Sequence, residues 1–359
     1  MDLEERIRLI SRPPTEEIIE PDELKSLLES SSRPLAYNGF EPSGQAHLGT
    51  GLVAAMKVND LTAAGCRFLV FLADWHAWVN GKLGSNLERI RSCGQYLIEV
   101  WKSLGVDTHN TQFVFGTDVY NNEYWKTVLK VAGEMNLTQA RKSLTISGRR
   151  DSENLPLRNF IYTPMQVADI FHMHVDICQL GIDQRKANIL AREIGPKLDM
   201  WKPLCVHHHL LMGLQGPKRM GFEEDEALDM QVSGKMGKSV EGSAIYVHDT
   251  PAEIRTKILA AYCPEKDPEN PILDMVHYLL MRDEQTPFLL RTRKNDEIYF
   301  EDYFELDRGY TEGRIHPLDL KISVAESLAK VLEPCRRHFE TDREARKLLA
   351  LVKSTETTR

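Results

Sequence analysis

The stretch that decides the fold class is Tyr37-Asn38-Gly39-Phe40-Glu41-Pro42-Ser43-Gly44-Gln45-Ala46-His47-Leu48-Gly49-Thr50-Gly51. It joins a short apolar run at 34–40 to an amphipathic, helix-like segment at 47–64. In parallel α/β sheets, ligands bind where a strand ends and a helix begins, and the free backbone N–H groups there favour phosphate. Glycines let a ligand approach the backbone closely. Taken alone, the segment also fits an ordinary glycine-rich turn.

Further apolar runs follow at 68–74, 111–117, 175–180 and 203–211, separated by longer amphipathic segments. Short apolar strands that alternate with helices predict an α/β domain whose parallel sheet is covered on both faces. The pattern ends near Ser243. A helix is then expected to begin at Thr250-Pro251, because a capping residue followed by proline in the first turn is a typical helix start.

The chain is long enough for about two or three domains. We expect an N-terminal helical segment at 1–33, an α/β domain at 34–245 and a mainly helical domain at 246–359. The polar stretch 216–230, with Glu223-Glu224-Asp225-Glu226, is interpreted as an insertion or a mobile loop.

The composition is that of a globular protein, with 42% hydrophobic and 27% charged residues, and it excludes disordered and collagen-like classes. The longest unbroken apolar runs, such as Phe68–Ala73, hold about six residues, well short of the ~20 that span a bilayer. The acidic start Met1–Glu5 does not resemble a signal peptide. Six scattered cysteines without a Cys-x-x-Cys pair are typical of reduced thiols, so we expect a cytoplasmic protein with no membrane partner.

The formal charge, 45 − 53 = −8, argues against binding nucleic acid by bulk electrostatics, although it leaves room for a local basic face. DNA is therefore not an expected partner. The triplet His207-His208-His209 could suggest a metal site, but adjacent residues alternate sides in a strand and the usual ligand set is lacking. We predict no metal site in the protein.

A second glycine-flanked segment, Gly234-Lys235-Met236-Gly237-Lys238-Ser239, lies near the end of the α/β region. Two lysines three residues apart on such a loop can close over a polyphosphate and stabilise charge in a transition state. A solvated surface loop is the alternative. Together, the His-x-Gly turn and the later Lys-Met-x-Lys-Ser loop resemble the paired signatures of class I aminoacyl-tRNA synthetases.

A third segment, Tyr162-Thr163-Pro164-Met165-Gln166-Val167-Ala168-Asp169, predicts a helix that begins at the Thr-Pro step. Gln166 and Asp169 then share a face, with Tyr162 just before the first turn. Polar groups that point one way among apolar neighbours indicate a small, specific pocket, and a partly exposed helix face is the alternative. Asp183-Gln184 follow an apolar run at another strand-to-helix junction.

With these segments the sequence resembles the tyrosyl-tRNA synthetases of the archaeal and eukaryotic type, from about residue 34 to 334. The resemblance implies a Rossmann-like, doubly wound parallel sheet followed by a helical anticodon-binding domain. The implied reaction activates L-tyrosine with ATP to tyrosyl-adenylate and pyrophosphate, and then transfers tyrosyl to the 3'-terminal adenosine of tRNA(Tyr). A homodimer is implied, with an interface around 111–155. Mg²⁺ would accompany ATP, with no tightly bound cofactor.

The resemblance also implies a role for individual residues. The catalytic donors and cations are His47, Thr50, Lys235 and Lys238. The substrate tyrosine is held by Tyr37 and Asp169 at its phenol and by Tyr162, Gln166 and Gln184 at its amino group. ATP is bound by Gly39, Glu41, His47, Gly49, Asp183, Lys235, Lys238 and Ser239. The first anticodon base is read by Asp319.

The sequence departs from the family pattern at three places. Thr50 replaces a second histidine, Gly237 replaces a serine in the lysine loop, and Pro164 stands one place later than usual. None removes a residue type that the chemistry requires. Two alternatives stay open: a tryptophanyl-tRNA synthetase, against which the phenol-binding pair Tyr37 and Asp169 argues, and a catalytically silent paralogue that binds RNA. The second would be expected to lose the lysine loop or His47.

Overall fold

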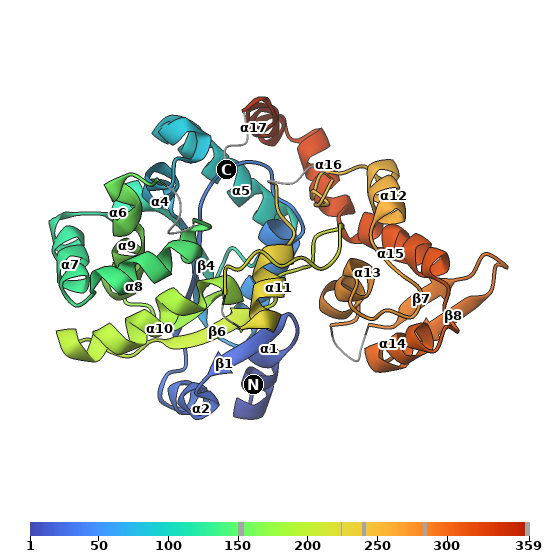
Figure 1. The fold of residues 1–359 in the computed structure, drawn as a ribbon, viewed down its shortest axis with the longest axis horizontal. Helices are drawn as coiled ribbons and strands as arrows, with labels where there is room; N and C mark the ends of the chain where they lie inside the picture. Colours follow the sequence, from blue (N-terminus) through green and yellow to red (C-terminus); the bar gives the residue numbers. More distant parts are fainter. Residues whose placement is uncertain (150–153, 224, 239–241, 283–285, 356–359) are drawn as a thin grey trace.

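A six-stranded sheet with the order β1-β6-β5-β2-β3-β4 organises the α/β part of the computed structural model (Figure 1). The structure describes residues 1–149, 154–223, 225–238, 242–282 and 286–355. The strands are β1 (Thr15–Ile19), β2 (Leu35–Phe40), β3 (Arg67–Leu72), β4 (Thr111–Phe115), β5 (Ile177–Gly181) and β6 (Leu204–His208).

The chain changes direction across the sheet at β2. It passes from β2 to β3 and β4 on one side, and then returns to the other side of β2 to form β5 and β6. These five strands are parallel, and Tyr37 of β2 lies opposite Leu69 of β3 and Cys178 of β5. The predicted doubly wound parallel sheet is confirmed. Its switch point, where a ligand site is expected, lies between the carboxyl ends of β2 and β5.

Strand β3 shows why both faces of the sheet are covered. Phe68, Val70 and Leu72 join one buried apolar cluster, while Leu69 and Phe71 join another on the opposite face. Successive side chains of a strand point to opposite faces, so a continuous apolar run indicates burial on both. Helices α3 (Ala54–Ala63) and α5 (Leu87–Ser103) pack in the first cluster, and α9 (Tyr162–His172) and α10 (Arg185–Ile194) in the second.

The segment 1–33, predicted to be helical, also contains a strand, and the prediction missed it. Helices α1 (Leu3–Ser11) and α2 (Pro21–Ser30) flank strand β1, which pairs antiparallel with β6. The sequence of β1, Thr-Glu-Glu-Ile-Ile, contains three β-branched residues, which favour a strand. The unpaired backbone edge of β6 supplies the partner that the local sequence does not reveal.

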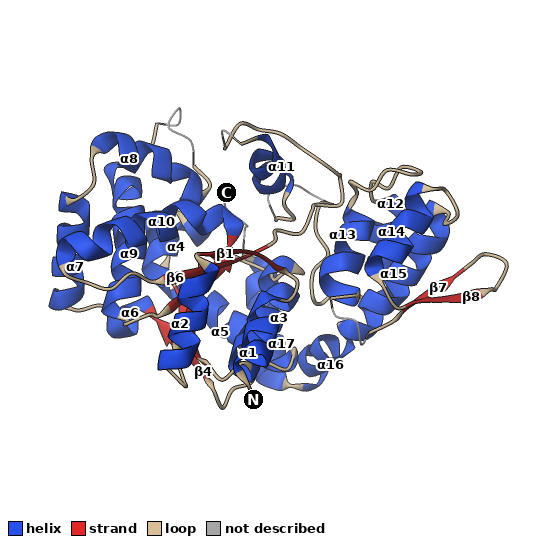
Figure 2. Ribbon diagram, turned by 90° about the horizontal axis from the view of Figure 1, so that it is seen from below, coloured by secondary structure: helices blue, strands red, loops and turns tan. Residues whose placement is uncertain are grey.

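Shorter helices connect the strands on the side of β3 and β4. They are α4 (Asp74–Val79), α6 (Gly116–Val119), α7 (Asn122–Gly133) and α8 (Leu137–Lys142), and the later helix α11 (Glu226–Gly234) ends at the lysine loop. In both ribbon views α11 lies between the sheet and the C-terminal helices (Figures 1 and 2). It begins within the acidic stretch 216–230, where the Asp229 carboxylate accepts hydrogen bonds from the backbone of Gly221 and Phe222.

The region after residue 246 is mainly helical, as expected. It contains α12 (Pro251–Ala260), α13 (Pro271–Met275), α14 (Tyr303–Thr311), α15 (Pro317–Val331), α16 (Glu333–Thr341) and α17 (Arg343–Ser354). The predicted start of α12 is confirmed, because Thr250 and Glu253 form a reciprocal capping box. A hairpin that the sequence reading did not predict, β7 (Phe288–Arg291) with β8 (Glu297–Phe300), projects from this region (Figure 2).

The last two helices return to the α/β domain. His338 of α16 lies 3.0 Å from the Glu99 carboxylate of α5, and the Phe339 ring packs on Tyr96 with 5.7 Å between centroids. Helix α17 packs along α5, at the top of Figure 1. The C-terminal region is thus joined to the α/β domain at its end as well as at its beginning. Within the described ranges, no helix combines the length and the apolar character that crossing a membrane requires.

Candidate active site

The histidine turn follows β2 at the switch point of the sheet. A π-helical turn at Gly49–Val53 leads into α3. Leu48 N donates to Ile245 O at 3.0 Å, and Val247 N donates to Ala46 O at 3.0 Å, so the segment after the lysine loop is bonded to the turn. A Cβ at Gly51 would stand 2.5 Å from a methyl carbon of Val247. Only glycine permits this close approach.

His47 is a neutral imidazole with a defined tautomer. Burial, together with the nearby Lys238 and Lys235 ammonium groups, lowers its pKa to about 3. Gly49 N donates to Nδ1 of His47 at 3.1 Å, which leaves the proton on Nε2. The ring can therefore donate one hydrogen bond without changing its charge. The Thr50 hydroxyl oxygen accepts from His47 N at 3.1 Å, so this residue also holds the turn.

The lysine loop lies against the chain that follows β6. Met236 N donates to Leu211 O at 2.6 Å, and Met212 forms a bridge with Lys235. Nζ of Lys235 lies 2.6 Å from a carboxylate oxygen of Asp183, and Nζ of Lys238 donates to the Ser43 hydroxyl at 3.2 Å. The two lysines thus reach the ends of β5 and β2 respectively. The predicted ATP-binding residue Ser239 lies outside the described residues.

Asp183 follows β5 and faces the same space. Burial raises its pKa, but Lys235 outweighs that effect and holds the pKa below its usual value. A Cβ at Gly181 would stand 2.6 Å from the Asp183 carboxylate and 2.9 Å from Leu210, so a larger residue here would displace the Asp183 side chain. A carboxylate and a lysine at one strand end, opposite a neutral histidine at the other, can hold a polar, phosphorylated ligand between them.

Glu41 and Gly39 complete the end of β2. The Glu41 carboxylate accepts from the Asn80 side chain at 3.1 Å and 3.2 Å, and Asn80 in turn accepts from Arg149 at 2.9 Å. At Gly39, an added Cβ would make ordinary contacts of 3.7 Å with Phe71 and Tyr37. Glu41 is therefore held in place, whereas packing within the chain does not require glycine at 39.

A second group of residues surrounds the Asp169 carboxylate of α9, which is 2% exposed. Tyr120 donates its phenol proton to one carboxylate oxygen at 2.7 Å, and Nε2 of His76 lies 3.4 Å from the other. Burial raises the pKa of Asp169 well above its ordinary value. Among the described side chains, no lysine or arginine forms an ion pair with Asp169. The groups that contact the carboxylate are thus neutral, and the nearby charge on Asp74 has the same sign.

The other residues expected around the tyrosine substrate lie near Asp169. Tyr37 of β2 is buried, and the nearby Asp169 charge contributes to its raised pKa, after burial itself. The Tyr162 ring packs edge-on against His76 at 4.9 Å. Gln166 donates to the Gln184 side chain at 3.1 Å, which links this group to the Asp183 strand end. In the described chain, the buried Oε1 of Gln166 has no hydrogen-bond partner.

The structure adds residues that the sequence did not identify. Tyr120 stacks on Tyr124 with 3.6 Å between ring centroids, and His76 lies beside Asp169. His76 follows β3 and Tyr120 follows β4. Their position just after the carboxyl ends of apolar runs was the available signal, because those ends meet at one edge of a parallel sheet.

Asp319 does not join this site. It lies in the first turn of α15, in the C-terminal region on the right of Figure 1, and is 8% exposed. Its carboxylate accepts hydrogen bonds from the backbone N and the Nε of Arg293, at 3.1 Å and 2.9 Å. In this structure Asp319 therefore fixes the turn between β7 and β8.

Comparison with known proteins identifies the family to which this site belongs. The family model described as tRNA synthetases class I (W and Y) matches residues 29–233 and 226–333. A tyrosine–tRNA ligase of Thermococcus sibiricus is 40% identical, with all of both chains covered, and that of Pyrococcus horikoshii is 41% identical over 99% of this chain and 100% of its own. The chain belongs to the tyrosyl-tRNA synthetase family of class I.

Solved structures of this family share the whole fold. The tyrosyl-tRNA synthetase from Pyrococcus horikoshii, solved as a complex with L-tyrosine, has a TM-score of 0.91 and 39% identity, covering 99% of this chain and 100% of that one. The enzyme from Aeropyrum pernix has a TM-score of 0.87 at 37% identity, with 99% and 100% covered. The family predicted from the sequence motifs is confirmed, and this member is an aminoacyl-tRNA ligase.

Proposed function

We propose that this synthetase activates L-tyrosine with ATP and transfers it to tRNA(Tyr), using the two groups of residues at the switch point. The names of the relatives support tyrosine over tryptophan, although the family model includes both. The silent-paralogue alternative is disfavoured, because His47, Lys235 and Lys238 are all present and directed at one space.

The observation that carries the proposal is a pair of buried polar side chains on one face of α9 that the described chain compensates only in part. At one end, the Asp169 carboxylate is buried among neutral donors. One turn away, Gln166 Oε1 is buried with no partner among the described groups. Both positions are costly unless a ligand supplies donors. A phenol hydroxyl at Asp169 and an ammonium group at Gln166 satisfy both, and tyrosine carries these groups at opposite ends.

In the first step a tyrosine carboxylate oxygen attacks the α-phosphorus of ATP. A bond from that oxygen to phosphorus forms, and the bond from phosphorus to the bridging oxygen breaks, so pyrophosphate leaves with its electron pair. A carboxylate is already nucleophilic, so the protein's contribution is positioning and stabilisation of charge. The Nε2–H of His47 and the two ammonium groups of Lys235 and Lys238 are the donors for the phosphates.

Lys235 must exchange partners during this step. In the structure it is bonded to Asp183, which leaves the Asp183 carboxylate for a ribose hydroxyl once the lysine turns to the phosphates. Mg²⁺ enters as part of the ATP substrate, because it binds phosphates and water more readily than an all-protein site. In the described part of the chain, no group of three or more His, Cys, Asp or Glu residues could hold a metal ion.

In the second step the terminal adenosine of tRNA(Tyr) attacks the tyrosyl carbonyl, and adenylate leaves. We place anticodon reading in the C-terminal region at Asp319, where Arg293 must share its partner with a base. A homodimer is supported by exposed apolar side chains on α7, α8 and the segment that follows them, namely Trp125, Leu129, Leu137, Leu157 and Ile161. A face of this kind is typical of a protein interface.

The test is ATP–pyrophosphate exchange with each of the twenty amino acids in turn. Exchange supported by tyrosine alone is expected. Lys238→Met is the matched control, because it should abolish exchange while the tyrosine pocket stays intact. Exchange with tryptophan alone would favour the alternative synthetase, and exchange with no amino acid, together with retained tRNA binding, would favour the silent paralogue.

A further inference from the structure

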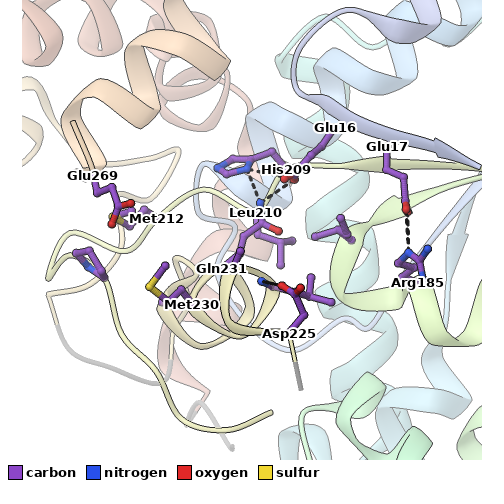
Figure 3. A pocket seen from close by; sticks show the side chains of 15 residues that line it. Glu16, Glu17, Arg185, His209, Leu210, Met212, Asp225, Met230, Gln231 and Glu269 are labelled. Carbon is purple, nitrogen blue, oxygen red and sulfur yellow. Dashed lines mark hydrogen bonds and ion pairs between the residues drawn. The ribbon is translucent and has the colours of Figure 1, made fainter. Parts of the chain in front are cut away.

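His209, just after β6, lies where three parts of the molecule meet. Its Nδ1 is 3.3 Å from the Glu16 carboxylate of β1 and 2.5 Å from the side-chain amide of Gln231 on α11. Its Nε2 is 2.7 Å from the Asp274 carboxylate of α13, in the C-terminal region. Figure 3 shows His209, Glu16 and Gln231 directed toward one another. The ring therefore connects the sheet, the helix before the lysine loop and the C-terminal region.

The contacts fix both the position and the charge of the ring. Its side chain is 13% exposed, and it stacks on Tyr278 with 3.8 Å between centroids. Burial lowers the pKa of His209, but the carboxylates of Asp274 and Glu16 outweigh it and raise the pKa to about 9. The hydrogen bond from Nε2 to Asp274 is strong because both partners carry charge, and the Glu16 carboxylate adds a more distant opposite charge on the Nδ1 side.

Asp274 is bonded to the backbone that supports the lysine loop. Its second carboxylate oxygen accepts from Met212 N at 2.9 Å. Met212 forms the bridge with Lys235, and the neighbouring Leu211 O accepts from Met236 N at 2.6 Å. A single carboxylate of the C-terminal region thus holds the short segment 209–212 on which the catalytic loop rests.

Helix α11 is not packed solidly against this junction. A cavity of about 570 Å³ lies between β1, the segment 209–212 and α11. Gln231 reaches across to β1, where its amide donates to Glu16 at 2.7 Å (Figure 3). Space beside a helix allows it to shift, because close packing is what resists movement in a protein interior. The position of α11, and of Lys235 at its end, then depends on the polar contacts at His209.

We propose that Asp274 and His209 are positioning residues for adenylate formation, which couple the position of the C-terminal region to the position of the lysine loop on the segment 209–212. The inference rests on the proposed function of that loop. Neither residue touches substrate. Loss of these contacts lets the lysine loop leave its place on the segment 209–212 more often, so its lysines stabilise the transition state less, while tyrosine binding, at Asp169 and Gln166, does not change.

The test is Asp274→Asn in the full-length protein, which keeps the shape and removes the charge. Couplings between sites are typically 5–150-fold, so we expect kcat for ATP–pyrophosphate exchange to fall within that range while KM for tyrosine is unchanged. The matched control is Asp302→Asn, which alters the cap of α14 in the same region without contacting His209. It should leave both constants as in the wild type.

A double variant tests whether Asp274 acts on kcat through Lys235. Since Asp274 acts through Lys235, adding Asp274→Asn to Lys235→Met should cost much less than it does in the wild-type background, because effects that share one route are not additive. Full additivity would overturn the proposal, as would an Asp274→Asn variant with wild-type kcat. If Asp274→Asn raises KM for tyrosine and also lowers stability in urea, Asp274 has a structural role instead, and this result would overturn the proposal as well.

If Asp274→Asn does not fold, Gln231→Leu on α11 tests the same contacts. Gln231→Leu should also lower kcat, by a smaller factor than Asp274→Asn. A wild-type kcat in this variant would contradict the proposal. The two hypotheses fail differently. If the wild-type protein shows no exchange with tyrosine, the proposed function is wrong, whereas normal wild-type exchange with unaffected variants rejects the coupling alone.

Discussion

Two buried carboxylates, Asp60 of α3 and Asp169 of α9, differ in what surrounds them. Asp60 is fully buried and meets three cations: Nζ of Lys57 at 3.0 Å and the guanidinium groups of Arg12 and Arg282. Burial lowers the pKa of Lys57 to about 8, even though the nearby Asp60 raises it. Asp169 is 2% exposed and meets neutral groups, a phenol and a neutral imidazole.

The difference separates a structural carboxylate from one reserved for a ligand. A buried charge is stable when the chain itself supplies the opposite charge, and Asp60 in this way joins α3 to Arg12 near the N-terminus and to Arg282 in the C-terminal region. A buried carboxylate without a cation is costly. Such a group is expected where an incoming donor recovers the cost, and this is the role that we propose for Asp169.

The largest expected effect is on Asp169. Asp169→Ala should lower the preference for tyrosine over phenylalanine by about 10³-fold or more. A site that hydrogen-bonds a substrate hydroxyl rejects the analogue that lacks it by 10⁴–10⁵-fold, and tyrosyl-tRNA synthetases are themselves the standard example. The measurement is kcat/KM for exchange with each amino acid. A variant that still rejects phenylalanine as strongly as the wild type would show that the pocket is misassigned.

Asp60→Asn should have the opposite profile. Removing one partner of a buried ion cluster costs about 3–5 kcal/mol, because the remaining charges lose their compensation. Urea unfolding should show that loss, while KM for tyrosine stays unchanged under conditions where the variant is folded. Asp169→Ala, which leaves no cation without its partner, is the matched comparison and should lose much less stability. Equal losses of stability in the two variants would show that Asp60 and Asp169 do not differ in their structural role.

His209 extends the comparison to pH, because the carboxylates of Asp274 and Glu16 compensate its charge as the cations compensate that of Asp60, while burial and the charge of His209 lower the pKa of the nearby His277. Its pKa is raised from 6.5 to about 9, so its stabilisation is complete below pH 6.5 and is lost as pH rises through 9. That shift corresponds to about 3 kcal/mol. The stability advantage of the wild type over His209→Asn should shrink by about this amount between pH 6 and 9.5 in urea titrations. An advantage that is constant with pH would contradict this assignment.

The smallest effect is expected for Tyr120→Phe. The variant removes one donor to Asp169 and keeps the ring that stacks on Tyr124. A hydrogen bond to a charged group contributes about 1.5–3 kcal/mol, so kcat/KM for tyrosine should fall at least about tenfold through poorer orientation of the carboxylate. Steady-state exchange kinetics would show it. An unchanged value would mean that Tyr120 does not position Asp169.

The fold was predictable wherever the sequence alone determines burial. Five strands appear as apolar runs because both faces of a parallel sheet are covered. Strand β1 does not, since Glu16 and Glu17 interrupt it and only the edge of β6 makes it a strand. The family motifs located the histidine turn and the lysine loop. His76 and Tyr120 were missed because their approach to Asp169 depends on the lateral order of strands, and no local pattern encodes that order.

The partners of Asp60 could not be predicted from the sequence for the same reason. Arg12, Asp60 and Arg282 stand far apart in the sequence, and nothing in their spacing indicates that they meet. The roles predicted for the individual site residues remain predictions, which the variants above would test. What the structure contributes is their grouping into one set at the ends of β2 and β5 and another around α9.

The return of α16 and α17 onto α5 has a consequence for how the protein is made. A ribosome delivers the chain from its N-terminus, so the α/β domain can begin to fold while its last covering helices have not yet been synthesised. Until Phe339 arrives, the apolar surface around Tyr96 stays open to water and to other chains. A messenger RNA truncated before the codon for Glu333 would therefore encode every residue proposed for catalysis and substrate binding. Its protein product would still be prone to aggregate.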